Sequence, residues 1–138
     1  MAKLDFVKIS KHSFAKLIEN EQVYKRLLIL TRNIGGGMRD LLKDTKANKF
    51  KTSKRTAIVA KIENKIVGWG LINTKAKNNP FNIFVAKNYR RCGIGTMIIK
   101  AAKYIAKKKT GKSKLRVFPQ DDAGWCFYSK NKVKVELD

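Results

Sequence analysis

The apolar side chains at the start of the chain follow two successive patterns. A compact apolar run at residues 4–9 predicts a first strand that ends at Ser10. From Ser13, a residue type that caps helices, apolar residues recur at spacings of three and four, which mark one face of a helix. The positions with this spacing are Phe14, Leu17, Ile18, Tyr24, Leu27 and Leu28. We expect the helix to end at the glycine run of residues 35–37.

A second, shorter helical pattern follows the glycine run. It consists of one or two turns that carry Met38, Leu41 and Leu42. Residues 43–54 are polar and rich in lysine, without an apolar periodicity, so we expect a loop there.

The middle of the chain changes to runs of β-branched residues. Residues 56–62 and 66–72 are two such runs, and the short polar connection Glu63-Asn64-Lys65 between them is typical of a hairpin. The turn-forming sequence Asn78-Asn79-Pro80 precedes another run, residues 81–86. Together these runs predict an antiparallel meander.

The strongest helical pattern lies after this meander. Apolar residues fall on one face and lysines mostly on the other, and Thr110-Gly111 ends the helix. The apolar positions are Ile94, Met97, Ile98, Ala101, Ala102 and Ile105. Residues 115–118 then predict a strand, residues 121–130 a short helix and residues 133–137 a terminal strand. The order β-α-α-β-β-β-α-β-α-β predicts a single α+β or α/β domain over residues 1–138.

The chain carries none of the signals of a secreted, membrane-spanning or zinc-binding protein. Its amino terminus has no apolar stretch followed by small residues, and no apolar run approaches the roughly 20 residues of a membrane-spanning helix. Cys92, Cys126 and His12 are too few and too dispersed for a zinc site, so we expect buried free thiols. We therefore expect a soluble cytoplasmic protein without a membrane partner.

Charge is the unusual property of the composition. The chain has 32 basic against 10 acidic residues, a formal net charge of +22. Such an excess attracts polyanions and repels cationic partners, so nucleic acid is one candidate partner. A compositional bias towards lysine is the other interpretation, but it does not explain the shortage of acidic residues. Charge alone gives affinity without identity, and both interpretations stay open.

The clearest chemical signal connects the last run of the meander to the strong helix. This segment reads Val85-Ala86-Lys87-Asn88-Tyr89-Arg90-Arg91-Cys92-Gly93-Ile94-Gly95-Thr96. A glycine-bearing turn at a helix start leaves main-chain N–H groups unpaired, and the positive end of the helix dipole helps them hold a phosphate. Gly93 and Gly95 allow close approach to the main chain. The segment predicts a pyrophosphate cradle, and a simple tight turn is the alternative.

This segment resembles the acetyl-CoA loop of the GNAT superfamily of N-acetyltransferases. That loop reads Arg/Gln-x-x-Gly-x-Gly/Ala after the fourth strand, and this chain has Arg90-x-x-Gly93-x-Gly95. Residues 124–130 are similar to a later helix of the family, and the order of elements matches along almost the whole chain. The resemblance implies a three-layer fold with a mixed, mostly antiparallel sheet, and acetyl-CoA as the acyl donor.

The resemblance also implies roles for individual residues. Phe84 and Val85 would pair main-chain groups with the pantetheine arm where the fourth and fifth strands separate. The phosphates would be lined by Arg90, Arg91, Cys92, Gly93, Ile94, Gly95 and Thr96. Asp121 stands where many members have an asparagine that contacts the cofactor. Tyr128 matches the position of a general acid for the departing thiolate, and an aromatic packed on the cofactor is the alternative.

Several features depart from the family pattern and bear on the acceptor. Gly124 replaces an alanine and Lys132-Val133 replace Gly-Phe. We expect the usual seventh strand to be missing or to be supplied by a partner in a homodimer. Asn82 stands on the strand where several relatives place an acidic base. A strongly positive surface lowers the pKa of a nearby ammonium, so an attacking amine can be neutral without a dedicated base.

Three functions stay open at this point. The leading one is an N-acetyltransferase whose acceptor is an amine of a protein or nucleobase in acidic or nucleic-acid surroundings, since small lysine-rich members are similar to phage or mobile-element products. The second is a nucleic-acid-binding protein that keeps the fold without turnover. The third is an acetyltransferase for a small amine. The aromatic residues Trp69, Trp125 and Phe127 line an acceptor pocket in one interpretation and belong to the core in the other.

Overall fold

Within the described residues, the central sheet has four antiparallel strands in the order β1-β2-β3-β4. The computed structural model describes residues 7–31, 38–47, 54–90, 93–117 and 130. The strands are β1 (Val7–Ser13), β2 (Thr56–Ile62), β3 (Lys65–Ile72) and β4 (Phe81–Val85). β1 continues past the end expected at Ser10, because Ser13 still pairs with Thr56 across the ladder. The predicted antiparallel meander is confirmed.

The predicted hairpin between β2 and β3 is confirmed, but it turns through Glu63 and Asn64 alone, because Lys65 already pairs with Ile62 as the first residue of β3. Both residues have positive φ, 50° and 67°, which gives a two-residue turn whose twist matches that of the flanking strands. Asparagine adopts this left-handed conformation readily. Farther along, the pairs Ala60–Gly68 and Lys61–Ile66 leave an extra residue on β3, so this strand carries a bulge.

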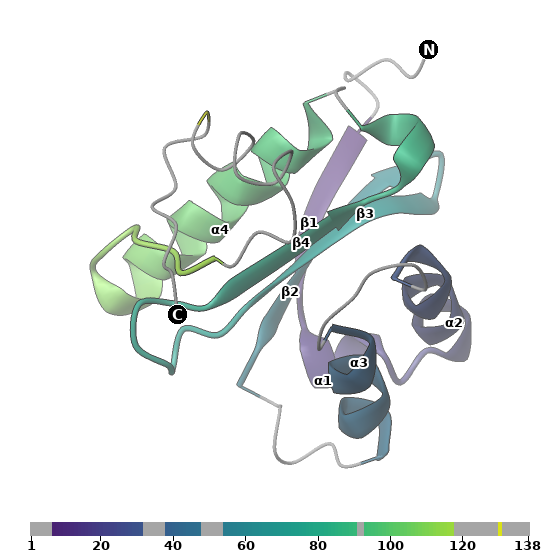
Figure 1. Cartoon of the computed structure of the whole chain (residues 1–138), viewed down its shortest axis with the longest axis horizontal. Helices are drawn as coiled ribbons and strands as arrows, with labels where there is room; N and C mark the ends of the chain where they lie inside the picture. Colours follow the sequence, from purple (N-terminus) through teal and green to yellow (C-terminus); the bar gives the residue numbers. More distant parts are fainter. Residues whose placement is uncertain (1–6, 32–37, 48–53, 91–92, 118–129, 131–138) are drawn as a thin grey trace.

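Three helices cover one face of the sheet (Figure 1): α1 (Phe14–Leu17), α2 (Glu21–Leu30) and α3 (Met38–Ala47). The expectation of one continuous helix from Ser13 is wrong, because the chain breaks between α1 and α2. Asn20 has extended backbone angles, and its side chain accepts a hydrogen bond from the Val23 N–H at 3.1 Å. This contact caps α2 as a separate helix.

The loop expected at residues 43–54 is wrong for its first part, since α3 continues to Ala47. Leu42 and Thr45 are both fully buried, so the buried face of α3 extends through a threonine that the apolar pattern did not count. Lys46 fastens α3 to the helices before it. Its Nζ lies 3.1 Å from Glu21 Oε2 and donates to the Ile18 carbonyl oxygen at 2.8 Å.

The opposite face of the sheet is covered by α4 (Ile94–Thr110), which gives the chain three layers (Figure 1). The strong helix that the sequence predicts is confirmed. Gly111, with φ of 80°, ends it and donates its N–H to the Lys107 carbonyl oxygen at 2.8 Å. The buried residues of α4 are Ile94, Gly95, Ile98, Ile99, Ala102, Ile105 and Ala106.

Two glycines of β3 allow α4 to lie close to the sheet. A Cβ atom on Gly70 would lie 2.8 Å from Ile98 Cγ2 and 2.9 Å from Phe81 Cε1, closer than such atoms can pack. A Cβ atom on Gly68 would lie 3.3 Å from Ile94 Cγ2. The absence of side chains at these positions therefore fixes the distance between α4 and the sheet, and with it the position of both ends of the helix.

The chain returns to the sheet after α4. Pro80 and Arg116 form a parallel bridge, and the Phe81 N–H donates to the Arg116 carbonyl oxygen at 2.9 Å. Asn79 is buried and donates its side-chain amide to the Lys114 carbonyl oxygen at 2.9 Å. The parallel bridge supports the expectation of a mixed, mostly antiparallel sheet. The expected strand at 115–118 is described as far as Val117.

The order of the described elements is β1-α1-α2-α3-β2-β3-β4-η3-α4, where η3 is a short 3-10 helix (Lys87–Tyr89). The expected order is thus confirmed through the strong helix, except that the first helix is two. The helix expected at residues 121–130 and the strand at 133–137 lie outside the described residues, apart from Lys130. Within the described part, no helix combines the length and apolar character needed to cross a bilayer.

Candidate functional site

The passage from β4 to α4 forms the candidate site. At the end of β4 the Ala86 N–H donates to the Val67 carbonyl oxygen at 2.8 Å, which holds the chain on the sheet up to that point. The short helix η3 follows, and the Tyr89 N–H donates to the Ala86 carbonyl oxygen at 2.8 Å. The chain then reaches Gly93 and enters α4. These hydrogen bonds fix the course of the chain from the end of β4 through η3.

Gly93 has the left-handed conformation, with φ of 84°, and its carbonyl oxygen accepts the Met97 N–H at 3.0 Å as the first bond of α4. No side chain caps this end, and the first turn contains no acidic residue. The N–H groups of the next residues, Ile94, Gly95 and Thr96, have no partner within the helix. We call these N–H groups and Gly93 the phosphate cradle, because the positive end of the helix dipole favours an anion there.

Arg90 connects the cradle to β4. Its Nε donates to the Val85 carbonyl oxygen at 3.0 Å, and its guanidinium carbon lies 5.6 Å from the centre of the Phe84 ring. The guanidinium is exposed, so it places a permanent positive charge at the surface next to the cradle.

The two sides of β4 carry different main-chain groups. The Asn73 N–H donates to the Pro80 carbonyl oxygen and the Ala86 N–H donates to the Val67 carbonyl oxygen, so alternate residues of β4 face β3. By this alternation the main chain of Phe84 faces Trp69. The main-chain groups of Ile83 and Val85 face away from β3, and among the described residues no neighbouring strand pairs with them. We call these groups the open edge of β4.

The structure describes most of the predicted site residues, in two stretches on either side of residues 91–92. These residues are Phe84, Val85, Arg90, Gly93, Ile94, Gly95 and Thr96. Arg91, Cys92, Asp121 and Tyr128 lie outside the described residues. The sequence interpretation missed Ile83, whose main chain lies on the same edge as that of Val85. The strict alternation of a strand is the signal that identifies it.

Two residues bear on where an acceptor could lie. Asn82 is exposed on β4, and none of the residues of β4 is acidic. Trp69 is fully buried and stacks on Phe14 with ring centres 5.9 Å apart, so it belongs to the core. Asn82 contacts solvent and Trp69 does not. Asn82 is therefore the polar side chain of β4 that an acceptor could reach.

A family model agrees with this geometry over more than half of the chain. The model described as acetyltransferase (GNAT) domain matches residues 53–132, which include β2, β3, β4 and α4. The comparison with curated proteins found no matching sequence.

Solved structures are similar to nearly the whole chain. An aminoglycoside acetyltransferase from an uncultured soil metagenomic sample is 22% identical, with 98% of this chain and 93% of that chain covered and a TM-score of 0.64. A GNAT family acetyltransferase from Streptococcus pneumoniae is 16% identical, covers 93% and 87%, and has a TM-score of 0.64. AAC(6')-Iy, in complex with a bisubstrate analogue containing CoA, is 12% identical, covers 93% and 90%, and has a TM-score of 0.68. At these identities the likeness shows the fold alone.

The cradle at the start of α4, the open edge of β4 and the three-layer fold agree with the family match. The resemblance seen in the Arg90-x-x-Gly93-x-Gly95 motif is therefore confirmed at the level of the family. The donor of acetyl groups in this family is acetyl-CoA. The chain belongs to the GNAT acetyltransferase family.

Proposed function

We propose that residues 1–138 form one N-acetyltransferase domain that takes its acetyl group from acetyl-CoA and transfers it to an amine. The observation that carries this proposal is the uncapped start of α4 directly beside the open edge of β4. An acidic or capping side chain at this end would repel or replace a phosphate, and neither is present among the described residues. The residues present therefore fit a ligand that carries both phosphates and amide groups.

The two parts of the site hold the two parts of such a donor. The N–H groups of Ile94, Gly95 and Thr96 would bind the pyrophosphate, and Arg90 and Arg91 would add charge. The main-chain groups of Ile83 and Val85 would pair with the amides of the pantetheine arm, as an additional strand pairs with a sheet edge. Phe84 would contribute its side chain, because its main chain faces β3. Acetyl-CoA supplies the acetyl group as a thioester, the activated form needed for transfer to an amine.

Proton transfers would rest on few side chains. Tyr128 Oη is our proposed proton donor to the departing sulfur, and Asp121 is a proposed contact of the cofactor. No carboxylate of β4 accepts the proton of the attacking amine, since Asn82 is the exposed polar residue there. The positive field of the chain would keep part of the amine neutral by lowering the pKa of its ammonium form.

The acceptor we favour is an amine of a protein or nucleobase in anionic surroundings. The net charge of +22 repels free polycations, which weakens binding of a highly charged polyamine. A small amine is the second candidate, because the names of four of the similar structures describe aminoglycoside acetyltransferases. The two candidates differ in the sign of charge around the amine, and this difference can be measured.

Acetyl-CoA consumption in the presence of matched acceptors tests both parts of the proposal. We expect the highest kcat/KM for an amine carried by an acidic peptide or an oligonucleotide, and a KM that rises with salt. A higher kcat/KM for an aminoglycoside, with a KM that falls as salt screens the repulsion between this polycation and the protein, would favour the second acceptor. Absence of acetyl-CoA binding in a calorimetric titration would contradict the donor itself, whichever acceptor is supplied.

A further inference from the structure

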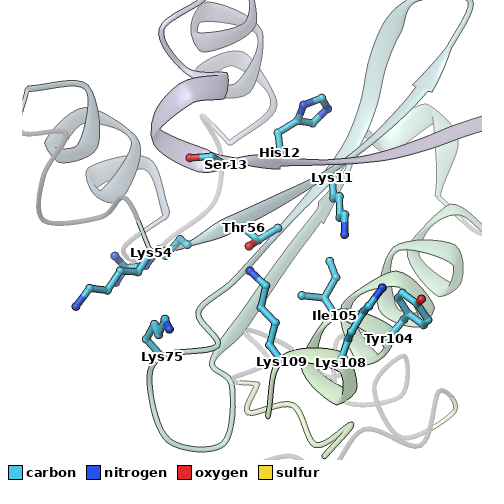
Figure 2. A pocket seen from close by; sticks show the side chains of 11 residues that line it. Lys11, His12, Ser13, Lys54, Thr56, Lys75, Tyr104, Ile105, Lys108 and Lys109 are labelled. Atoms are coloured by element: carbon cyan, nitrogen blue, oxygen red, sulfur yellow. The ribbon is translucent and has the colours of Figure 1, made fainter. Parts of the chain in front are cut away.

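A cationic pocket lies at the end of α4 that is opposite to the phosphate cradle. Its lining comes from the end of β1, the start of β2, the loop after β3 and the last turns of α4 (Figure 2). It has a volume of about 390 Å³. The part of α4 that lines the pocket begins at Tyr104, ten residues after Ile94, which is about 15 Å along the helix from the cradle. The pocket is therefore a second site and no extension of the first.

Among the described residues, the lining combines many cations with no acidic residue. The basic residues are Lys11, Lys54, Arg55, Lys75, Lys108 and Lys109. All of these lysines are exposed, and among the described residues no ion pair joins any of the six to a carboxylate. Figure 2 shows Lys11 and Lys109 extending from two different elements towards the space around Thr56, and Lys108 extending towards Tyr104. Like charges that converge in this way repel one another, and a polyanion bound between them removes the repulsion.

An exposed aromatic ring borders the pocket. The Tyr104 side chain is 62% exposed, and Lys108 Nζ lies 5.6 Å from the centre of its ring. Hydroxyl groups of Ser13 and Thr56 lie in the same lining. Ammonium and hydroxyl groups bind a phosphate, whereas the tyrosine ring contributes nothing to phosphate binding. An exposed ring beside cations is the arrangement on which an unpaired nucleobase stacks while its phosphates are neutralised.

We propose that this cationic pocket binds single-stranded nucleic acid. Its phosphates lie among Lys11, Lys108 and Lys109, and one base stacks on Tyr104. The phosphates of a duplex could also pair with the lysines, but the bases of a duplex are stacked on one another and cannot stack on Tyr104. An acidic peptide also lacks a base to stack. The inference goes beyond the proposed acetyl transfer and does not depend on it, because the cradle is at the other end of α4.

The first experiment measures binding of a short labelled single-stranded oligonucleotide by fluorescence anisotropy over a range of salt concentrations. The triple variant Lys11→Gln, Lys108→Gln, Lys109→Gln should bind at least about tenfold more weakly, with a salt slope smaller by roughly two. The matched control Lys25→Gln, Lys43→Gln, Lys65→Gln removes the same charge at exposed positions on other elements and should change affinity less than about twofold. An equal loss in both variants would overturn the assignment, because the general charge would then account for binding.

The second experiment separates nucleic acid from other polyanions. Tyr104→Ala should weaken binding of the oligonucleotide about tenfold, and Tyr104→Phe should retain it, because phenylalanine keeps the stacking surface. Polyglutamate, used as a competitor, and a duplex of the same sequence should bind more weakly than the single strand and should not respond to Tyr104→Ala. Equal affinity of the wild type and Tyr104→Ala for the single strand would overturn the proposal.

A third measurement keeps the two sites distinct. Acetyl-CoA titrated into the Lys11, Lys108 and Lys109 triple variant should bind as it does to the wild type, because the substitutions are at the far end of α4. The substituted side chains are exposed, so the variant should keep the melting temperature of the wild type within a few degrees. Loss of acetyl-CoA binding in this folded variant would overturn the assignment of a separate pocket.

Discussion

The two ends of α4 both suit anions, but they do so by opposite means. At the first turn the main chain supplies unpaired N–H groups, the dipole is positive, and Gly93 lets a ligand approach. At the last turn the dipole is negative and the main chain offers carbonyl oxygens, so attraction of an anion depends on side chains such as Lys108 and Lys109.

This difference teaches how specific each end can be. Main-chain groups have fixed positions, so the cradle selects the geometry of its ligand as well as its charge. Lysine side chains are long and flexible, and they attract many anions with little selection. Selectivity at the last turn would therefore rest on Tyr104, because the other ring of the described lining, that of His12, points away from the lysines (Figure 2).

The largest expected effect comes from placing the same anion at each end of α4. Gly93 and Gly111 both have left-handed φ, so Gly93→Asp and Gly111→Asp carry a similar backbone cost of about 1 kcal/mol. Gly93→Asp should weaken acetyl-CoA binding on the order of 100-fold, since the carboxylate repels the phosphates and occupies the N–H groups, a loss of about 3 kcal/mol. Calorimetric titration measures this loss. Equal affinities of the two variants would contradict the cradle.

The next effect concerns stability and the glycines that set the height of α4 above the sheet. Gly70→Ala should lower the free energy of unfolding by about 1–3 kcal/mol, because the new Cβ atom would lie 2.8 Å from Ile98 Cγ2. Gly68→Ala is the matched control, since its nearest contact is 3.2 Å, and it should cost less. Urea denaturation of both variants measures which substitution lowers the free energy of unfolding more. A smaller effect at Gly70 would show that α4 can move away from the sheet.

The cradle was predictable from the sequence and the cationic pocket was not. The cradle is formed by neighbouring residues, so Gly93 and Gly95 beside Arg90 were sufficient to locate it. The pocket joins residues as far apart as Lys11 and Lys109, and only the folded sheet brings them together. The net charge of the sequence predicted an attraction to anions, but it did not predict which residues form the anion-binding surface.

The same contrast holds for the elements of the fold. The hairpin at Asn64 was predicted because its turn chemistry is local. The break at Asn20 was missed because α1 and α2 bury the same side, so the apolar spacing continues through it. α3 was predicted too short because Thr45 is buried without being apolar. These errors share a cause. Packing against the sheet determines which residues of a helix are buried, and the sequence of the helix alone does not show this packing.

A smaller effect is expected from the cation beside the cradle. Arg90→Gln should weaken acetyl-CoA binding about fivefold, roughly 1 kcal/mol, because it removes an exposed charge and the bond to the Val85 carbonyl oxygen. Lys87→Gln removes the same charge from an exposed position in η3 and should have less effect. Titrations at two salt concentrations measure both changes. A larger loss in the Lys87 variant would show that general charge is more important than the position of Arg90.

The smallest expected effect concerns His12, which contributes to the lining at the pocket end of the sheet but points away from the space between the lysines (Figure 2). Burial, and then the charge of Lys61, lower the pKa of His12 below its ordinary value of 6.5. The unfolded chain therefore takes up the proton first as pH falls, so this contribution to stability is complete above about pH 6.5 and is lost below it. Thermal melting from pH 8 to pH 5 should show a small decline that His12→Gln reduces. An identical decline in the variant would show that other titratable groups cause the decline. The Ser10 hydroxyl, 2.8 Å from His12 Nε2, is not one of them, because a hydroxyl group does not titrate in this range.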